Sequence, residues 1–151
     1  MNDWKKILIA VDDTPTSRKA VQYAANIIGR LEEVRIHLLH IYPEPPPDYY
    51  SRGGSLDDYR GEKEKESGAI FADSIQTLAG SGIAREIITS ECRMAERRTI
   101  SQTILAVQEE GGYGTVVVGK RGVSKAEEFL FGSISNALLH HGRDIAIWVV
   151  G

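Results

Sequence analysis

The sequence predicts an α/β fold: a single domain over residues 1–151, with a doubly wound, five-stranded parallel sheet and helices on both faces. Two observations lead to this prediction. Segments with the composition of strands alternate with segments whose apolar residues recur at helical spacing. Signals for antiparallel hairpins are absent between them, so each helix is expected to carry the chain back to the start of the next parallel strand.

The first unit consists of a strand, an acidic turn and a helix. Residues 6–11 form a continuous apolar run, typical of a strand buried on both faces, and the run stops at Asp12 and Asp13. Thr14 is a suitable helix N-cap, and Pro15 suits the first helical position. The apolar stripe of the predicted helix comprises Ala20, Val21, Ala24, Ile27, Ile28 and Leu31.

The second and third units follow the same pattern with a long insertion. A second strand is predicted over 34–42, and the proline-rich segment 43–55 is predicted to be an extended surface loop, because proline continues neither a ladder nor a helix. A long charged helix is expected over 56–79 and a weaker third strand within 83–92.

The last part of the chain completes the alternation. A third helix is predicted over 99–110, and the two glycines that follow, at 111 and 112, are expected to end it. A fourth strand is predicted over 115–118, a fourth helix over 130–141 and a fifth strand over 145–150.

Composition excludes several classes of protein. With a formal net charge of -3, the chain lacks the basic surface of a sequence-independent nucleic-acid binder. Its one cysteine, Cys92, cannot form an internal disulfide and is interpreted as a small, partly buried residue. The apolar runs are too short for a signal peptide or a membrane span, so we expect a cytoplasmic protein with no membrane partner.

A ligand site is expected beyond the carboxyl ends of the strands, where two segments have suitable chemistry. One is the acidic turn after the first strand. The other follows the fourth strand, where Gly119 and Gly122 would let the backbone approach a phosphate. Lys120, Arg121 and Lys125 bring positive charge to the same segment. This combination indicates a polyphosphate ligand.

Gly132 and Ser133 extend this pattern to the start of the predicted fourth helix. The free N–H groups and the dipole of a helix N-terminus favour an anion there, and the serine hydroxyl could bond a phosphate or help to hold Mg²⁺. The spacing Gly-x2-Gly-x9-Gly-[Ser/Thr] should arise by chance in roughly 2 of 100 chains of this composition. The alternative interpretation is that the glycines only make turns and Ser133 only caps the helix.

The same residues carry a family resemblance that spans essentially the whole chain. Segments 7–12, 38–41, 116–122 and 132–135, with the closing apolar strand, resemble the ATP-binding branch of the universal stress protein family. The resemblance implies an adenine nucleotide alpha hydrolase-like fold with strand order 3-2-1-4-5. It also implies a regulatory protein of the stress response that acts as a nucleotide-dependent sensor or switch.

The resemblance further implies where ATP, or ADP or AMP, would lie, with Mg²⁺ as its companion ion. Asp12 and the backbones of Ala10 and Ile41 would contact adenine, and Val118 and Gly119 would lie by the ribose. The phosphates would lie near Gly122, Gly132, Ser133 and Ile134, and the predicted site also includes Val11, Lys120 and Arg121. In the family the last strand often pairs with its copy, so a homodimer through 145–150 is implied, with an unidentified protein partner beyond it.

Two features depart from the family pattern. Asp13 stands where many members have a small residue, and a second carboxylate near the phosphates could weaken binding. The proline common before the last strand is absent. The segment 43–55 lies where the family varies most.

Other folds and activities fit less well. A receiver domain would also place two acids after the first strand, but segment 88–93 lacks the required phosphoacceptor aspartate. A flavodoxin would need glycine in segment 12–17, which has none. The four histidines, at 37, 40, 140 and 141, suggest neither a metal cage nor a nucleophile with its base.

Three functions remain open from the sequence. Nucleotide binding by a sensor is favoured. A slow ATPase, or an autophosphorylating protein that uses Ser133, is the alternative enzyme, although Asp13 is a candidate base by position only. The third is an interaction module with an empty cleft.

Overall fold

The computed structural model describes residues 2–120 and 134–151 of the chain. Its elements in chain order are β1 (Asp3–Ala10), α1 (Pro15–Ile28), β2 (Arg35–Pro43), α2 (Pro47–Ser51), α3 (Leu56–Gly80), the 3-10 turn η1 (Arg85–Ile87), β3 (Ile88–Ala95), α4 (Ile100–Gly111), β4 (Tyr113–Gly119) and β5 (Ala146–Val150). Residues 134–141 are helical, so they agree with the end of the predicted fourth helix. The predicted start of that helix lies outside the described residues.

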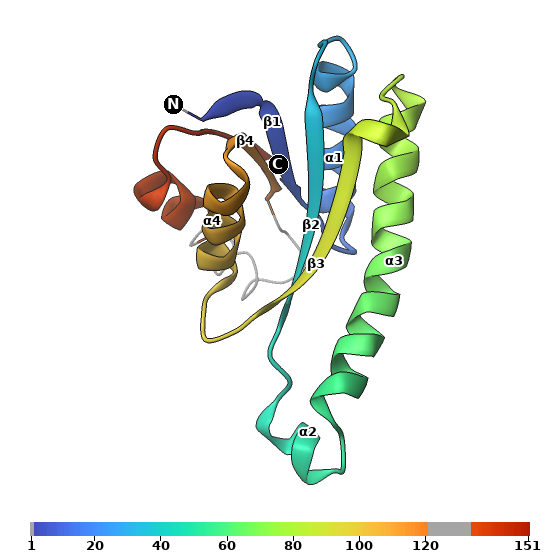
Figure 1. The fold of residues 1–151 in the computed structure, drawn as a ribbon, viewed down its shortest axis with the longest axis vertical. Helices are drawn as coiled ribbons and strands as arrows, with labels where there is room; N and C mark the ends of the chain where they lie inside the picture. Colours follow the sequence, from blue (N-terminus) through green and yellow to red (C-terminus); the bar gives the residue numbers. More distant parts are fainter. Residues whose placement is uncertain (1, 121–133) are drawn as a thin grey trace.

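The five strands form one parallel sheet in the order β3-β2-β1-β4-β5, which confirms the predicted order. β1 is therefore central, with β2 on one side and β4 on the other. Figure 1 shows α1 and α3 on one face of the sheet, and α4 with the segment 134–141 on the other. The predicted doubly wound arrangement is thus observed.

Alternation along β1 divides the core between these two faces. Ile7 and Ile9 pack into one buried cluster with residues of α1 and α3. Leu8 packs into a second cluster with Ile104 of α4 and Leu138 of the C-terminal helical segment. Because successive side chains of a strand point to opposite faces, one apolar run supplies both layers of the core.

The structure corrects three of the predicted boundaries. β1 begins at Asp3 and ends at Ala10, instead of spanning 6–11. Gly114 in β4 leaves room for this early start, because any side chain there would clash with β1: a Cβ would lie 2.4 Å from the backbone carbonyl carbon of Asp3. The segment 43–55 is not wholly extended, because it contains α2, which begins at Pro47. Proline can begin a helix because the N–H groups of the first helical turn have no partner within the helix, so the missing N–H of proline costs nothing there.

The third strand also differs from its prediction over 83–92. Ile83 is buried and Ile87 packs against the same core cluster, but Ile87 belongs to η1 and Ile83 precedes that turn, so neither is part of the strand. β3 itself runs through the polar positions Glu91 and Arg93 to Ala95. It is an edge strand, so charged side chains are tolerated there.

β5 forms the opposite edge of the sheet and is apolar on both faces. Trp148 and Val150 pack toward the cluster of α1 and α3, whereas Ile147 packs toward that of α4. Val149 is 42% exposed. In the described part of the chain β5 pairs only with β4. No helix in that part is both long and apolar enough to cross a membrane.

Candidate functional site

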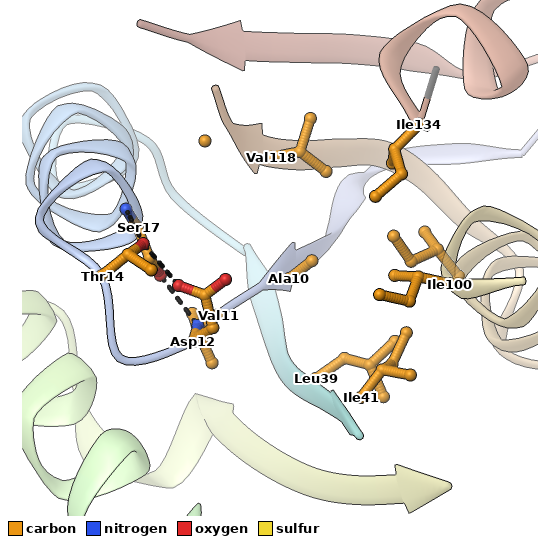
Figure 2. Close-up of a pocket in the computed structure, with 12 residues that line it drawn as sticks. Ala10, Val11, Asp12, Thr14, Ser17, Leu39, Ile41, Ile100, Val118 and Ile134 are labelled. Atoms are coloured by element: carbon orange, nitrogen blue, oxygen red, sulfur yellow. Dashed lines mark hydrogen bonds between the residues drawn. The ribbon is translucent and has the colours of Figure 1, made fainter. Parts of the chain in front are cut away.

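A pocket lies at the carboxyl ends of β1, β2 and β4, facing the start of α4 (Figure 2). This is where an open parallel sheet is expected to bind its ligand, since the order of the strands reverses at β1. The pocket is lined by Ala10, Val11, Asp12, Thr14, Ser17, Leu39, Ile41, Ile100, Ile104, Val118, Gly119 and Ile134.

The polar side of the pocket is the turn between β1 and α1. Thr14 Oγ1 donates a hydrogen bond to Asp12 Oδ1 at 2.5 Å, and the Asp12 backbone N–H donates to Ser17 Oγ at 2.9 Å. The Ser17 N–H in turn donates to Thr14 Oγ1 at 3.1 Å, as an N-cap requires. The dashed lines in Figure 2 follow this network. It fixes the Asp12 carboxylate beside the N-terminus of α1.

The opposite side of the pocket is aliphatic. Ile41 lies at the end of β2, and Ile100 lies on the first turn of α4. Ile134 opens the described C-terminal helical segment, and Figure 2 shows it across from Ile100 and above Ile41. An apolar cleft with a few fixed polar groups is the usual composition of a small-molecule site.

Gly119 is held close to the first turn of α1. A Cβ at this position would lie 2.8 Å from the backbone oxygen of Thr16, so any larger residue would push β4 away from α1. The next residue, Lys120, is exposed, and its N–H donates to the Val150 carbonyl at 2.6 Å. The start of the predicted phosphate segment is thus tied to the last residue of β5.

The structure brings together seven residues of the predicted site: Ala10, Val11, Asp12, Ile41, Val118, Gly119 and Ile134. Lys120 is adjacent in the chain but does not line the pocket. Arg121, Gly122, Gly132 and Ser133 lie outside the described residues.

Five further residues line the pocket that the motif did not identify. Thr14 and Ser17 carry a sequence signal only as helix-capping groups, and Ile100 and Ile104 only as one face of a helix. Leu39 has no signal beyond its place in an apolar strand. Only the tertiary structure shows that α4 covers this end of the sheet.

Asp13 does not share the pocket with Asp12. Its carboxylate accepts a hydrogen bond from Arg18 at 2.9 Å, and its side chain is 82% exposed. Asp13 therefore has a surface partner of opposite charge, and its effect on phosphate binding stays a prediction. Among the residues that the structure describes, no group of three or more His, Cys, Asp or Glu side chains could hold a metal ion.

The histidines of β2 have structural partners. His40 Nδ1 lies 2.8 Å from the Val11 carbonyl oxygen and fixes the chain just after β1. His37 lies 2.6 Å from Thr89 Oγ1 and 3.1 Å from Glu91 Oε2, and its ring stacks on Tyr113. Both histidines therefore connect β2 to neighbouring segments of the sheet.

Cys92 and Glu110, near β3, are among the groups with shifted pKa values, and both lie outside the pocket. Burial raises the pKa of the Cys92 thiol, so a reactive thiolate is disfavoured there. Hydrogen bonds from Arg93 lower the pKa of Glu110 at the end of α4. Neither group lines the pocket.

Comparisons with known proteins agree with this architecture. Residues 3–144 match the profile of the Universal stress protein family. The chain is 27% identical over 140 residues to the universal stress protein YxiE of Bacillus subtilis (strain 168), a match that covers 88% of this chain and 90% of that protein.

Solved structures show the same fold. The universal stress protein UspA from Lactobacillus plantarum aligns over 100% of both chains, with a TM-score of 0.74 and 15% identity. The universal stress protein from Archaeoglobus fulgidus in complex with dAMP covers 97% of each chain, with a TM-score of 0.62 and 16% identity.

Proposed function

The chain belongs to the universal stress protein family, and on that premise we propose that it binds an adenine nucleotide, ATP in the first instance, in the pocket between β1, β2, β4 and α4. Bound nucleotide would make it a sensor or switch in a cytoplasmic stress response. The observation that carries this proposal is the convergence of Ala10, Asp12, Ile41 and Val118 on one pocket at the switch point of the sheet.

The chemistry of the pocket supports an adenine ring in particular. The aliphatic side chains of Ile41, Ile100 and Ile134 would cover the faces of the base, while the carboxylate of Asp12 offers an acceptor for a hydrogen-bond donor of the nucleoside. Guanine also presents donors to a carboxylate, so the expected preference for adenine over guanine rests on the family resemblance and not on Asp12 alone.

The phosphates would extend from Gly119 toward the segment 121–133. The sequence supplies glycines, basic residues and Ser133 there, which suits a polyphosphate. Mg²⁺ usually reaches such sites through the substrate phosphates, and the Ser133 hydroxyl would help to hold it there. The related Archaeoglobus protein is in complex with dAMP, so the number of phosphates is left to experiment.

We propose binding without rapid turnover. The polar side chains that line the pocket, Asp12, Thr14 and Ser17, bond one another and cap α1. This network positions a ligand and gives no pairing of a nucleophile with its base.

The test is to identify the nucleotide and to remove its predicted phosphate contacts. Protein purified without added nucleotide is denatured, and released small molecules are identified by mass spectrometry. Calorimetric titration with Mg-ATP, ADP, AMP and Mg-GTP then ranks the ligands. We expect stoichiometric binding of an adenine nucleotide and loss of ATP binding when Gly122 and Gly132 are both replaced by valine.

A matched control is the double replacement of Gly61 and Gly68 by valine, because both lie on α3 with open space where a Cβ would be. This control should bind as the wild type does. A wild-type protein that arrives empty and does not bind millimolar Mg-ATP would contradict the proposal and favour an interaction module.

A further inference from the structure

The proline-rich segment after β2 contacts the loop that begins α4. We call residues 96–99, between β3 and α4, the α4 entry loop. The carboxylate of Glu44 accepts a hydrogen bond from the Arg97 backbone N–H at 3.0 Å. Arg60, near the start of α3, forms an ion pair with Glu96 at 2.8 Å. The segment 43–55 therefore contacts the α4 entry loop at Arg97, and the start of α3 contacts it at the preceding residue.

The α4 entry loop has an unfavourable backbone conformation. Arg97 has a φ of 51°, in the left-handed region that a residue with a long side chain rarely adopts. Such a conformation persists when surrounding contacts hold it. The bond from its own N–H to the Glu44 carboxylate is the charge-assisted contact that fixes this peptide. The exposed ion pair between Arg60 and Glu96 contributes less.

Glu44 itself lies on a stiff segment. Proline on each side, at positions 43 and 45, restricts the backbone. The Tyr59 hydroxyl donates to the Pro43 carbonyl at 2.6 Å, and the ring of Tyr59 packs edge-on against Tyr42 of β2 and Tyr49 of α2. The Glu44 carboxylate is therefore held in a fixed position relative to the α4 entry loop.

The α4 entry loop determines where α4 starts. Thr99 is the N-cap and forms a reciprocal capping box with Gln102. The next residue, Ile100, lines the pocket, and Ile104 lines it one turn later. A shift of the loop would move both side chains relative to β2 and so change the aliphatic wall.

We propose that Glu44 is a positioning residue for the nucleotide site: through Arg97 it fixes the entry into α4 and thereby holds Ile100 against the base. This inference rests on the proposed function. It gives the proline-rich segment a regulatory role, because any contact that moves Glu44 would alter nucleotide affinity without touching the nucleotide.

The test compares Glu44→Ala with Asp48→Ala in the full-length protein. Asp48 is an acid of the same insertion, but its ion pair is with Arg52 inside that insertion. We expect Glu44→Ala to weaken Mg-ATP binding by about 3- to 10-fold, as for partial loss of a hydrogen bond to a charged group. Asp48→Ala should leave the affinity unchanged, and the melting temperature of both variants should stay near that of the wild type.

A second variant separates positioning from a general structural effect. Asparagine adopts the left-handed conformation more readily than arginine. Arg97→Asn should therefore restore much of the lost affinity in the Glu44→Ala background. Equal affinities of wild type, Glu44→Ala and Asp48→Ala would overturn the inference.

Hydrogen exchange gives a readout that needs no nucleotide. Amides of residues 100–104 should exchange faster in Glu44→Ala than in the wild type, while those of α1 stay the same. Unchanged exchange would overturn the positioning role even if the protein failed to bind ATP. Failure of the wild type to bind ATP, together with faster exchange in Glu44→Ala, would instead contradict the proposed function alone.

Discussion

Arg93 connects the edge of the sheet to the end of α4 through two carboxylates. It donates from Nη1 and Nη2 to Glu110 at 3.1 and 3.0 Å, and from Nε and Nη2 to Glu91. Glu91 also contacts His37 of β2. A single guanidinium therefore links β3 and α4 beside the pocket and can satisfy both partners because its donors form a planar fork.

This arrangement predicts a specific dependence of stability on pH. Arg93 lowers the pKa of Glu110 in the folded protein, so the carboxylate adds stability above its unfolded pKa of about 4.3. That stability is lost as the pH falls through the lower, folded pKa. Glu110→Gln should reduce the acid-dependent part of the free energy of unfolding, measured with denaturant between about pH 7 and pH 3. The change should be small, since Glu110 is 58% exposed.

Glu109→Gln provides the control for this prediction. Glu109 is the exposed neighbour of Glu110 and has no ion-pair partner among the residues that the structure describes. Replacing Glu109 should leave the fall in unfolding free energy at acid pH as it is in the wild type. Parallel pH profiles for the wild type and Glu110→Gln would show that the bond to Arg93 adds no stability in solution.

Single pocket residues could be predicted only where they belong to a motif. The end of β1 and the glycine after β4 have recognisable sequence, so Asp12 and Gly119 were found. Ile100 and Ile104 lie on one apolar face of α4, but a helical stripe in a sequence does not indicate which end of a sheet it will cover. That information lies in the geometry of the α4 entry loop.

At the scale of elements, α1 begins where local chemistry requires it. Thr14 has extended backbone angles, its hydroxyl accepts the Ser17 N–H, and Pro15 follows it. Thr14→Ala should cost about 1 kcal/mol of unfolding free energy, because an N–H of the first turn loses its acceptor. Chemical denaturation measures the loss. Thr14→Ser keeps the hydroxyl and should retain most of the stability; equal losses in both variants would assign the effect to the methyl group instead.

Elements with local start signals were predicted well, whereas those set by tertiary contacts were not. The capped helices α3 and α4 fall close to their predicted ranges, and α1 begins at Pro15 as predicted but ends at Ile28, before Leu31. α2 was missed because a run of prolines is typical of extended chain, although Pro47 is compatible with a first turn. β3 was misplaced because Ile83 is buried by a turn, and because an edge strand needs no apolar run.

At the scale of the whole molecule, β5 is an edge strand that pairs only with β4 in the described part of the chain, so its other edge can bind a partner. An edge strand with apolar side chains on both faces is suited to pairing with another strand. We propose that a second copy of the chain pairs there, as the family resemblance implies.

This homodimer makes a testable prediction. Val149→Lys should convert a dimer to a monomer, because it places a charge on the proposed contact. Sedimentation velocity measures the mass. Tyr50→Lys is the matched control, since Tyr50 is 49% exposed on α2, at the far end of the insertion (Figure 1), and should leave the dimer intact. A wild-type protein that is monomeric at tens of micromolar would contradict the proposal.

The central position of β1 has a consequence for synthesis on the ribosome. Of the five strands β1 is made first, yet its partner β4 is the fourth: the Thr115 hydroxyl bonds the Trp4 carbonyl across 111 residues. Pairing between such distant segments is entropically slow, so β1, α1 and β2 can associate long before one flank of β1 is covered. The pocket needs Val118, and it therefore cannot form on a nascent chain until β4 has been translated.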